Sequence, residues 1–295
     1  MAVTAENIVP LATVDKSQGY WRAVWSRFLR DKVAVCAGLV AAGLVLMAIF
    51  APWIAPADPL QGTMLKRLSP IGTEGYPLGA DELGRDMLSR LIYGARLSLF
   101  MGVVPVLIAF AIGSAIGIAA GYLGGWVNTI TMRTLDVLYA FPSVLLAIAI
   151  SGALGAGILN GLLSLTVVFI PPIARVAESV TTSVRKLEYI EAAQASGASS
   201  LRIVRDHVLG NVLGPIFVYA TSLISVSMIL AAGLSFLGLG VSPPNAEWGL
   251  MLNTLRNAIY VQPWLAALPG VMIFMTSISF NMLSDGLRSA MDVKQ

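Results

Sequence analysis

The sequence predicts an all-α integral membrane protein with six transmembrane helices and both termini in the cytoplasm. The chain has 295 residues, of which 57% are hydrophobic and only 12% are charged, whereas soluble domains contain roughly 25% charged residues. The apolar residues also gather into long uncharged blocks, and a helix needs roughly 20 residues to cross a bilayer. A transmembrane barrel would instead alternate polar and apolar residues in segments of about ten.

Five uncharged blocks hold the six expected spans. They lie at residues 33–51, 97–124, 137–174, 216–238 and 265–284. The third block is long enough for two crossings, with the glycine-rich residues 152–161 as the turn between them. Lipid offers no hydrogen-bond partner to exposed backbone groups, so each crossing is expected to be helical. In the second span, Gly113, Gly117 and Gly121 share one helix face and are expected to let a neighbouring helix pack closely.

These spans divide the chain into segments with different expected surroundings. The segments are a cytoplasmic tail with an amphipathic helix (1–32), a first transmembrane helix (33–51), an extracytoplasmic segment (52–96), a five-helix core with a cytoplasmic loop at about 177–215 (97–285), and a cytoplasmic tail (286–295). Residues 1–18 are polar and are expected to be mobile. The first span starts late and exceeds the roughly 7–15 residues of a signal-peptide core, which indicates an uncleaved anchor.

The distribution of Lys and Arg predicts the orientation of the chain. Thirteen of these residues lie on the side of the termini and the long loop, and six lie on the other side. Cytoplasmic loops carry an excess of Lys and Arg, so the termini and the loop at 177–215 are expected in the cytoplasm. The basic residues are dispersed and are not interleaved with exposed aromatic residues, which argues against a nucleic-acid partner.

Two helices are expected outside the spans. Residues 20–32 place aromatic and basic side chains at helical spacing, which indicates an amphipathic helix on the inner leaflet or the cytoplasmic end of the first span. In the extracytoplasmic segment, Asp81 is expected to cap a helix whose apolar side includes Met87. Near one membrane entry, Arg133 and Asp136 lie three residues apart and are expected to form an interfacial ion pair.

Residues for catalysis, metal binding and ion coupling are scarce. Cys36 is the single cysteine and His207 the single histidine, which excludes a disulfide framework and a multi-histidine metal site. The chain has no phosphate-binding P-loop motif, and the centres of the spans lack the charges that ion-coupled transporters bury. "GLSFLG" around Ser235 is not a nucleophile elbow, because Leu237 replaces the required Gly. We therefore expect a passage, not an enzyme, whose energy comes from a partner.

The stretch "EYIEAAQASGASSLRIVRDHVLGNVLGP" (188–215) is the most informative polar segment. Residues 187–195 favour a helix, because they contain several Ala and no Gly or Pro. Gly197 suits a left-handed turn that ends this helix, and Ser199 is placed to cap a second one. The apolar residues expected on one face of the second helix are Leu201, Val204 and Val208. Two interpretations remain, a solvent-exposed connection and a rigid projection that another protein can move.

The same stretch resembles the coupling motif E-A-A-x-x-x-G of permease subunits in ABC importers that use a binding protein. The motif positions are Glu191, Ala192, Ala193 and Gly197. "YPLGADELGRDMLSRLIYGARLSL" (76–99) looks like the segment before the second span in the dipeptide, oligopeptide and nickel permeases, and "SFLGLGVSPPNAEWGLML" (235–252) resembles their external loop. The resemblance covers almost all of residues 21–292. Of the two permease subunits that form a pair in this group, the chain is more similar to the one with the shorter external region.

This resemblance implies a type I ABC importer transmembrane fold in the bacterial inner membrane. The implied partners are a second homologous permease subunit, two ABC ATPase subunits or one that homodimerises, and an extracytoplasmic binding protein. Glu191, Ala192, Ala193 and Gly197 would contact the ATPases, with support from Ser199, Leu201, Val204 and Gly210. No cofactor would be bound by this chain, since ATP and Mg would be used by the ATPases.

The implied cargo is a di- or oligopeptide, which would follow a path lined by spans two to six. Nickel and glutathione are alternative cargoes of the same machinery, and an ion-coupled secondary transporter is the alternative from another class. Two positions depart from the family pattern. Gly210 stands where the family usually has Pro, and Ala246 replaces the Pro that often precedes Glu-Trp-Gly. Gly permits a bend but does not impose one, so the geometry after the coupling region stays open.

Overall fold

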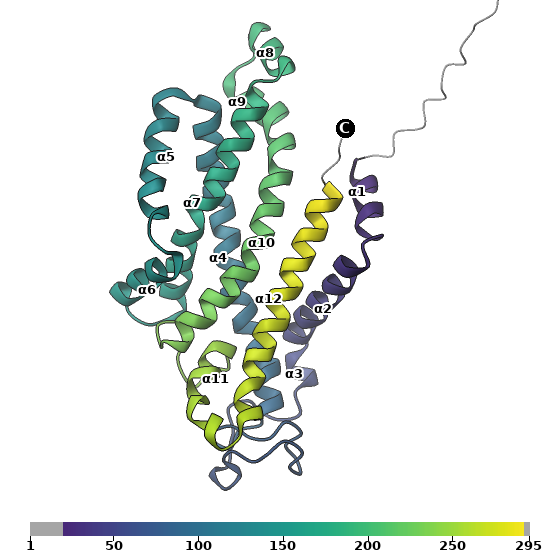
Figure 1. The fold of residues 1–295 in the computed structure, drawn as a ribbon, viewed down its shortest axis with the longest axis vertical. Coiled ribbons are helices and arrows are strands. Elements are labelled where there is room, and N and C mark those ends of the chain that lie inside the picture. The colour runs from purple at the N-terminus through teal and green to yellow at the C-terminus, as the bar shows by residue number, and fades with distance from the viewer. Residues whose placement is uncertain (1–19, 292–295) are drawn as a thin grey trace, which may run out of the picture.

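The apolar blocks of the sequence form long helices in the computed structural model, which describes residues 20–291. Five helical segments are long and apolar enough to cross a membrane. They are α2 (Lys32–Ile49), α4 (Met87–Leu123), α7 (Ile158–Arg185), α10 (Leu209–Phe236) with the helical residues before it, and α12 (Pro263–Met291). No β-strand occurs between residues 20 and 291, and Figure 1 shows the helices as an upright bundle. The expected tail at 1–18 and the last residues, 292–295, lie outside the described range.

The remaining crossing is a broken helix and not the single helix that the uncharged block suggested. α5 (Gly125–Tyr139) and α6 (Ser143–Leu154) meet at an angle of 85°. Pro142 lies at this break, and proline disfavours helical backbone in the residue before it, here Phe141. Counted as one span, the pair brings the total to six, which confirms the expected number of spans.

Short helices complete the described part of the chain. They are α1 (Tyr20–Phe28), α3 (Ala51–Ile54), the 3-10 turns η1 (Met64–Lys66) and η3 (Arg256–Tyr260), α8 (Glu188–Ala195), α9 (Ser200–Ile203), the π-helical turn η2 (Val204–Val208) and α11 (Trp248–Thr254). In Figure 1, α1, α8 and the C-terminal end of α12 lie at one end of the bundle, with α3 and α11 at the other. We call these the coupling end and the outer end.

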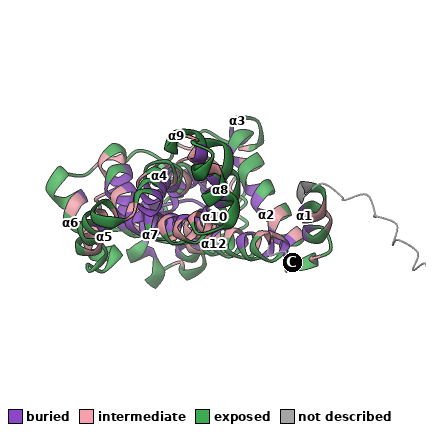
Figure 2. Cartoon of the chain, turned by 90° about the horizontal axis from the view of Figure 1, so that it is seen from above, coloured by how far each residue is buried: buried purple, intermediate pink, exposed green. Residues whose placement is uncertain are grey.

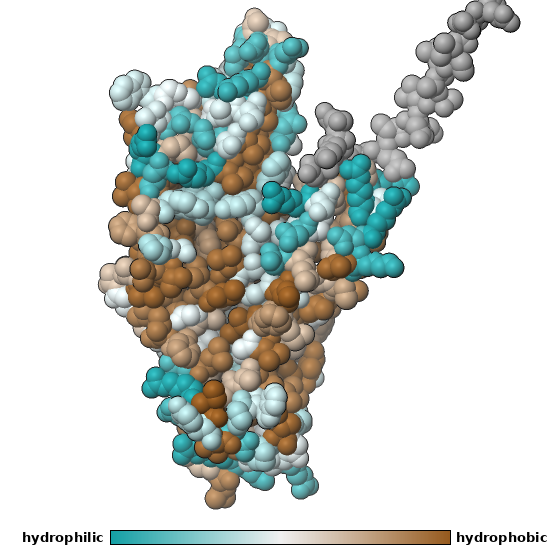
Figure 3. All heavy atoms as spheres, viewed as in Figure 1, coloured by the Kyte–Doolittle hydropathy of each residue, from teal (hydrophilic) through white to brown (hydrophobic). Residues whose placement is uncertain are grey.

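The surface of the bundle agrees with a membrane environment. On the face shown in Figure 3, apolar side chains form a band across the middle, and hydrophilic side chains gather at both ends. Exposed apolar residues of the long helices include Leu39 of α2 and Leu163 of α7. The assignment of the coupling end to the cytoplasm rests on the Lys and Arg count and stays a prediction.

The core lies where α4 packs against α7 and α10, and Figure 2 shows buried residues concentrated in these helices. Close packing depends on the three glycines expected to allow it. A Cβ atom at Gly113 would lie 3.0 Å from the Ile170 carbonyl oxygen, and one at Gly121 would lie 2.7 Å from that of Glu178. At Gly117 a Cβ atom would overlap the Ala174 carbonyl oxygen. The prediction of a close helix contact is therefore confirmed, and the neighbour is α7.

A smaller cluster attaches the N-terminal helix to the bundle. Val24 and Phe28 of α1 pack with Ala34 of α2 and Ala290 of α12. α1 is a separate helix, because Asp31 caps α2 by accepting hydrogen bonds from the backbone N–H groups of the second and third residues after it. Trp25 stacks on the Phe28 ring but remains exposed, as does Leu29. Part of the apolar face of α1 therefore packs on the bundle, and part is exposed.

Candidate functional site

The expected coupling helix forms and ends in a complete Schellman motif. α8 ends at Ala195, where the N–H of Ala198 donates to the Ala193 carbonyl at 3.1 Å and that of Gly197 donates to the Gln194 carbonyl at 3.0 Å. This geometry needs a left-handed residue after the helix, and Gly197 has φ +78°. A Cβ atom there would meet no atom within 4 Å, so only backbone strain favours glycine.

The face that α8 presents to solvent is small and polar. Glu191 and Ala192 are exposed, whereas Ala193 is half-buried against the core. Ile190 is fully buried and anchors the helix to the bundle. The four motif residues therefore lie together at the tip of the coupling end, although they do not all face outward. Their contact with an ATPase stays a prediction.

Contacts among Tyr189, His207 and Asn211, which the sequence did not assign to the coupling site, hold α8 in place. The side-chain amide of Asn211 donates to the His207 carbonyl at 2.7 Å and to the Tyr189 hydroxyl at 3.1 Å. The rings of Tyr189 and His207 also meet edge to face, 6.3 Å apart. Because Tyr189 lies in α8 and Asn211 in α10, these contacts join the projection to the start of a membrane helix. The only sequence signal was the presence of the single histidine of the chain.

The second helix of the coupling region differs from the expected one. Leu201 is 81% exposed and Val208 is fully buried, so they do not share a face as predicted. The preceding buried residue of this segment is Ile203, five residues before Val208. A spacing of five matches the π-helical turn η2, in which each N–H bonds to the carbonyl five residues back. Ser199 has the backbone angles of a cap, but its side chain forms no capping hydrogen bond.

The exit from the coupling region is helical. Gly210 lies in the first turn of α10, and a Cβ atom there would meet no atom within 4 Å. α9, η2 and α10 form one continuous helical stretch from Ser200 to Phe236. The departure from the family's proline at this position therefore introduces no break. The coupling region passes directly into a membrane-spanning helix.

The outer end contains a set of buried ion pairs and hydrogen bonds that we call the outer clasp. Its residues are Asp81, Arg85, Arg90, Ser98, Glu247 and Trp248. Asp81 accepts hydrogen bonds from the backbone N–H of Arg85 at 2.9 Å and from its Nε at 2.7 Å. The Arg90 guanidinium lies 3.0 Å from the same carboxylate. Buried charges are stable only when they are paired in this way.

The role expected for Asp81 is therefore wrong. α4 begins at Met87 and is capped by Asp86, whose carboxylate accepts from the backbone N–H of Ser89 at 2.8 Å and from its hydroxyl at 2.6 Å. A capping side chain reaches only the second or third residue after it, and Asp81 lies too far before Met87 to do this. Its carboxylate closes the turn before the helix instead.

Arg90 connects segments that are distant in the sequence. It is 2% exposed, and its guanidinium donates to the Pro59 carbonyl at 3.0 Å and to the Asn245 carbonyl at 3.4 Å. With the Asp81 ion pair, one side chain therefore holds the extracytoplasmic segment against the external loop. The sequence offered only a charge just before an apolar block.

Glu247 and Trp248 close the other side of the outer clasp. The Glu247 carboxylate caps α11 by accepting from the N–H groups of Gly249 at 2.9 Å and Leu250 at 2.8 Å, and the Ser98 hydroxyl donates to it at 3.1 Å. Trp248 is fully buried and donates its indole N–H to the Leu91 carbonyl at 2.9 Å. Burial raises the pKa of Glu247, against the opposing effect of these hydrogen bonds.

The expected ion pair on α5 is present and includes a further partner. Arg133 lies 3.9 Å from Asp136, and Arg175 of α7 pairs with the same carboxylate. The Arg175 guanidinium also lies over the ring of Tyr139, 5.4 Å from its centroid. The pair thus helps to hold α5 against α7. Within residues 20–291, no group of three His, Cys, Asp or Glu side chains is placed to hold a metal ion.

Comparison with known proteins gives consistent matches along the chain. Residues 113–294 match the family described as binding-protein-dependent transport system inner membrane component, and residues 19–70 match the N-terminal transmembrane domain of oligopeptide transport permease C. The chain is 42% identical to the glutathione transport system permease protein GsiD of Pectobacterium atrosepticum, over 93% of this chain and 91% of the relative. GsiD of Escherichia coli O157:H7 is also 42% identical, over 98% and 95%.

A solved structure shares the fold. The inward-facing MetNI methionine ABC transporter matches 69% of this chain and 97% of its own with a TM-score of 0.56, at 19% sequence identity. At this identity the likeness concerns the arrangement of helices. It confirms the predicted type I importer fold.

Proposed function

Because the chain belongs to the family of binding-protein-dependent transport system inner membrane components, we propose that it forms half of a passage for glutathione. The chain is a multi-pass permease subunit of an ABC importer in the bacterial inner membrane, and it belongs to the peptide and nickel group. As a permease it is a transport component. The cargo, the other subunits, the working of the coupling loop and the absence of enzymatic activity in this chain are the proposed parts.

The choice of glutathione rests on the relatives that are 42% identical over nearly the whole chain and carry that name. Glutathione is a tripeptide with one free amino group and two carboxylates, so it fits the peptide cargo expected from the sequence. A dipeptide or longer oligopeptide is the second candidate. The match of residues 19–70 to an oligopeptide permease domain favours it.

The proposed assembly supplies what this chain lacks. A second homologous permease completes the passage as a heterodimer, and an extracytoplasmic binding protein delivers the cargo. Two ABC ATPase subunits bind ATP and Mg and contact the coupling helix around Glu191, Ala192, Ala193 and Gly197. This chain has no P-loop motif, so nucleotide binding and hydrolysis are assigned to the ATPases.

One observation carries the proposed mechanism: α8 is held rigidly at the end of a helix that reaches the outer end. The helical stretch Ser200–Phe236 has 37 residues, and a helix rises 1.5 Å per residue, so it is about 55 Å long. At its far end, the side-chain amide of Asn253 donates to the Phe236 carbonyl, next to the outer clasp. Movement of α8 by the ATPases would therefore be transmitted along this continuous helix and change access at both ends.

Uptake by the complete importer tests this function. Cells that lack other glutathione uptake would produce both permeases, the ATPases and the binding protein, and radiolabelled glutathione would be supplied. The expected result is uptake that stops when vanadate blocks the ATPases. A dialanine probe in the same cells tests the second candidate. Uptake that resists vanadate and follows the proton gradient would contradict the importer mechanism.

A further inference from the structure

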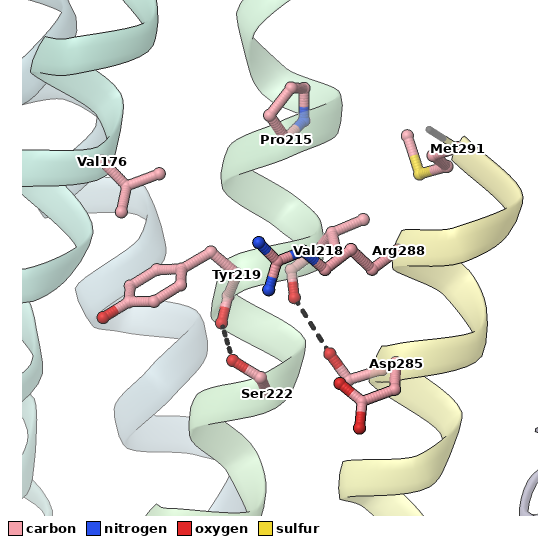
Figure 4. A pocket seen from close by; sticks show the side chains of 9 residues that line it. Val176, Pro215, Val218, Tyr219, Ser222, Asp285, Arg288 and Met291 are labelled. Carbon is pink, nitrogen blue, oxygen red and sulfur yellow. Dashed lines mark hydrogen bonds between the residues drawn. The ribbon is translucent and has the colours of Figure 1, made fainter. Parts of the chain in front are cut away.

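A cavity of about 580 Å³ opens between α7, α10 and α12, in the half of the bundle nearer the coupling end. Figure 4 shows the side chains around it. Its polar lining comes from Tyr219 and Ser222 of α10 and from Asp285 and Arg288 of α12. Apolar side chains, among them Val176 of α7, form the rest of the wall. Small-molecule sites have this character, with volumes of roughly 300–1,000 Å³ and a few convergent polar groups.

The two charged residues are available to a ligand. Asp285 and Arg288 are exposed, and neither forms an ion pair with another residue in the described range 20–291. In Figure 4 the Arg288 guanidinium reaches from α12 towards Tyr219 of α10, while the Asp285 carboxylate lies about one helical turn away. One cation and one anion therefore border the same cavity at separate points.

The wall that carries these groups is well defined. The hydroxyls of Thr221 and Ser284 lie 3.0 Å apart and link α10 to α12, and the Ser284 hydroxyl also donates to the Val218 carbonyl at 3.1 Å. This link lies directly beside Ser222 and Asp285 in the sequence. The cavity is thus bordered by two helices whose relative position is held by hydrogen bonds.

The charged groups lie where water can reach the cavity. Asp285 and Arg288 follow the uncharged block 265–284 at the coupling end of α12, and both are exposed. Arg288 points towards α10 and Tyr219 in Figure 4. A ligand that enters the cavity from the coupling end can therefore meet both charges.

We propose that this cavity is a binding site for a short peptide with a free amino group and a free carboxylate. The peptide would occupy this site last, before its release at the coupling end. Arg288 binds the peptide carboxylate, with the Tyr219 hydroxyl as a second donor, and Asp285 binds the ammonium group. Charge-assisted hydrogen bonds of this kind are the strong ones. The site rests on the proposed import of glutathione or a related peptide, and it names the residues that meet the cargo inside this chain.

Equilibrium binding to the complete transporter tests the site. Both permeases and the ATPases would be placed in phosphatidylcholine nanodiscs without nucleotide or binding protein, so that no anionic lipid competes for Arg288. The probes are radiolabelled glutathione and dialanine. We expect saturable binding that Arg288→Gln weakens about tenfold or more, as loss of a hydrogen bond to a charged group does. Arg256→Gln, at an exposed position of the outer end, is the matched control and should bind like the wild type.

An amidated probe separates ligand contact from a structural role. Dialanine amide lacks the carboxylate, so wild-type transporter should bind it more weakly than dialanine, and Arg288→Gln should bind both alike. Equal weakening of both probes by Arg288→Gln would overturn the assignment. So would unchanged affinity combined with loss of the permease pair in size-exclusion chromatography, which would make this face a subunit interface.

The proposed cavity site and the proposed glutathione cargo can be contradicted separately. If wild-type transporter imports glutathione with its binding protein but binds neither probe saturably in nanodiscs, the cavity proposal is wrong and the proposed function stands. If glutathione is not imported but dialanine binds in an Arg288-dependent way, the cavity stands and the glutathione cargo is wrong.

Discussion

The two ends of the bundle differ in how their charged residues are placed. At the outer end, the charges of Asp81, Arg90 and Glu247 are at most 2% exposed, and Arg90 and Glu247 are bound by partners from distant segments. At the coupling end, Glu191 is exposed and is followed by Ala192 and Ala193. The outer clasp uses charge to hold loops in one position. The coupling helix uses a rigid backbone to present a surface with few side-chain contacts.

This difference predicts how each end responds to mutation. Removing one partner of a buried ion pair leaves an uncompensated charge, which costs about 3–5 kcal/mol. Exposed charges contribute little to stability, typically about 0–1 kcal/mol. Changes at the outer end should therefore reduce the amount of folded protein, and changes at the coupling end should reduce transport by protein that is folded.

The largest effect is expected for Asp81→Ala. It leaves Arg85 and Arg90 buried without their shared carboxylate, so the stability of the outer end should fall by about 3–5 kcal/mol. Thermal unfolding of the purified permease pair and its abundance in membranes measure this. Glu74→Ala, at an exposed position of the same segment, is the control. Equal abundance of the two variants would contradict a stabilising role for the outer clasp.

Glu247 should show a smaller effect that depends on the replacement. Glu247→Ala leaves the N–H groups of Gly249 and Leu250 without an acceptor, at about 1–3 kcal/mol. Glu247→Gln keeps an acceptor oxygen and removes a charge that burial disfavours, so it should be better tolerated. Thermal unfolding of both variants in detergent measures the difference, and a larger loss with Gln than with Ala would contradict it.

Because the pKa of Glu247 is raised, its contribution to stability depends on pH. The folded state holds the Glu247 proton more tightly than the unfolded chain does. Its contribution to stability is therefore greatest below the ordinary carboxyl pKa of 4.5 and falls as pH rises through the interval up to the raised value. Unfolding scans across this interval should show a smaller pH dependence for Glu247→Gln than for the wild type.

Gly197→Val should separate transport from folding. A β-branched residue at φ +78° costs at least about 1 kcal/mol locally, and it would change the end of α8 without touching the membrane core. We expect near-normal abundance, with glutathione uptake and ATPase activity of the complex falling together. Gly43→Val is the control, because that glycine lies in α2 with open space around it and no positive φ. Normal transport by Gly197→Val at normal abundance would contradict the coupling role.

Glu191→Lys should have the smallest effect on folding and a clear effect on docking. The side chain is exposed, so its stability contribution is at most about 1 kcal/mol, but the charge at the proposed ATPase contact is reversed. Co-purification of the ATPases with the permease pair should decrease, most strongly at low ionic strength. Glu188→Lys, in the first turn of the same helix, controls for the added positive charge.

The orientation of the two ends can be tested without disturbing either. In a Cys36→Ala background, a cysteine at Thr73 should react with an impermeant thiol reagent in cells with an opened outer membrane. A cysteine at Ser199 should not react until the inner membrane is broken. The reverse pattern would place the coupling end outside and would remove the basis for ATPase docking.

The sequence by itself determined the features that depend on neighbouring residues. Hydropathy is a local property, so the spans could be located, and the need for φ > 0 after α8 could be read from Gly197 alone. The coupling motif and the family followed from short stretches in the right order. The roles of Glu191, Ala192 and Ala193 remain predictions, because their proposed partner is another chain.

Only the tertiary structure decided which polar residues are buried together. Arg90 bonds to the Asn245 carbonyl across 155 positions, and Ser98 bonds to Glu247 across 149. Asp81 and Asp86 both precede α4, and the choice between them as its cap depends on where the helix begins. Likewise, Leu201 and Val208 could not be assigned to faces until the π-helical turn was known. Propensity and hydropathy act over a few residues, whereas these contacts exist only once distant helices have packed.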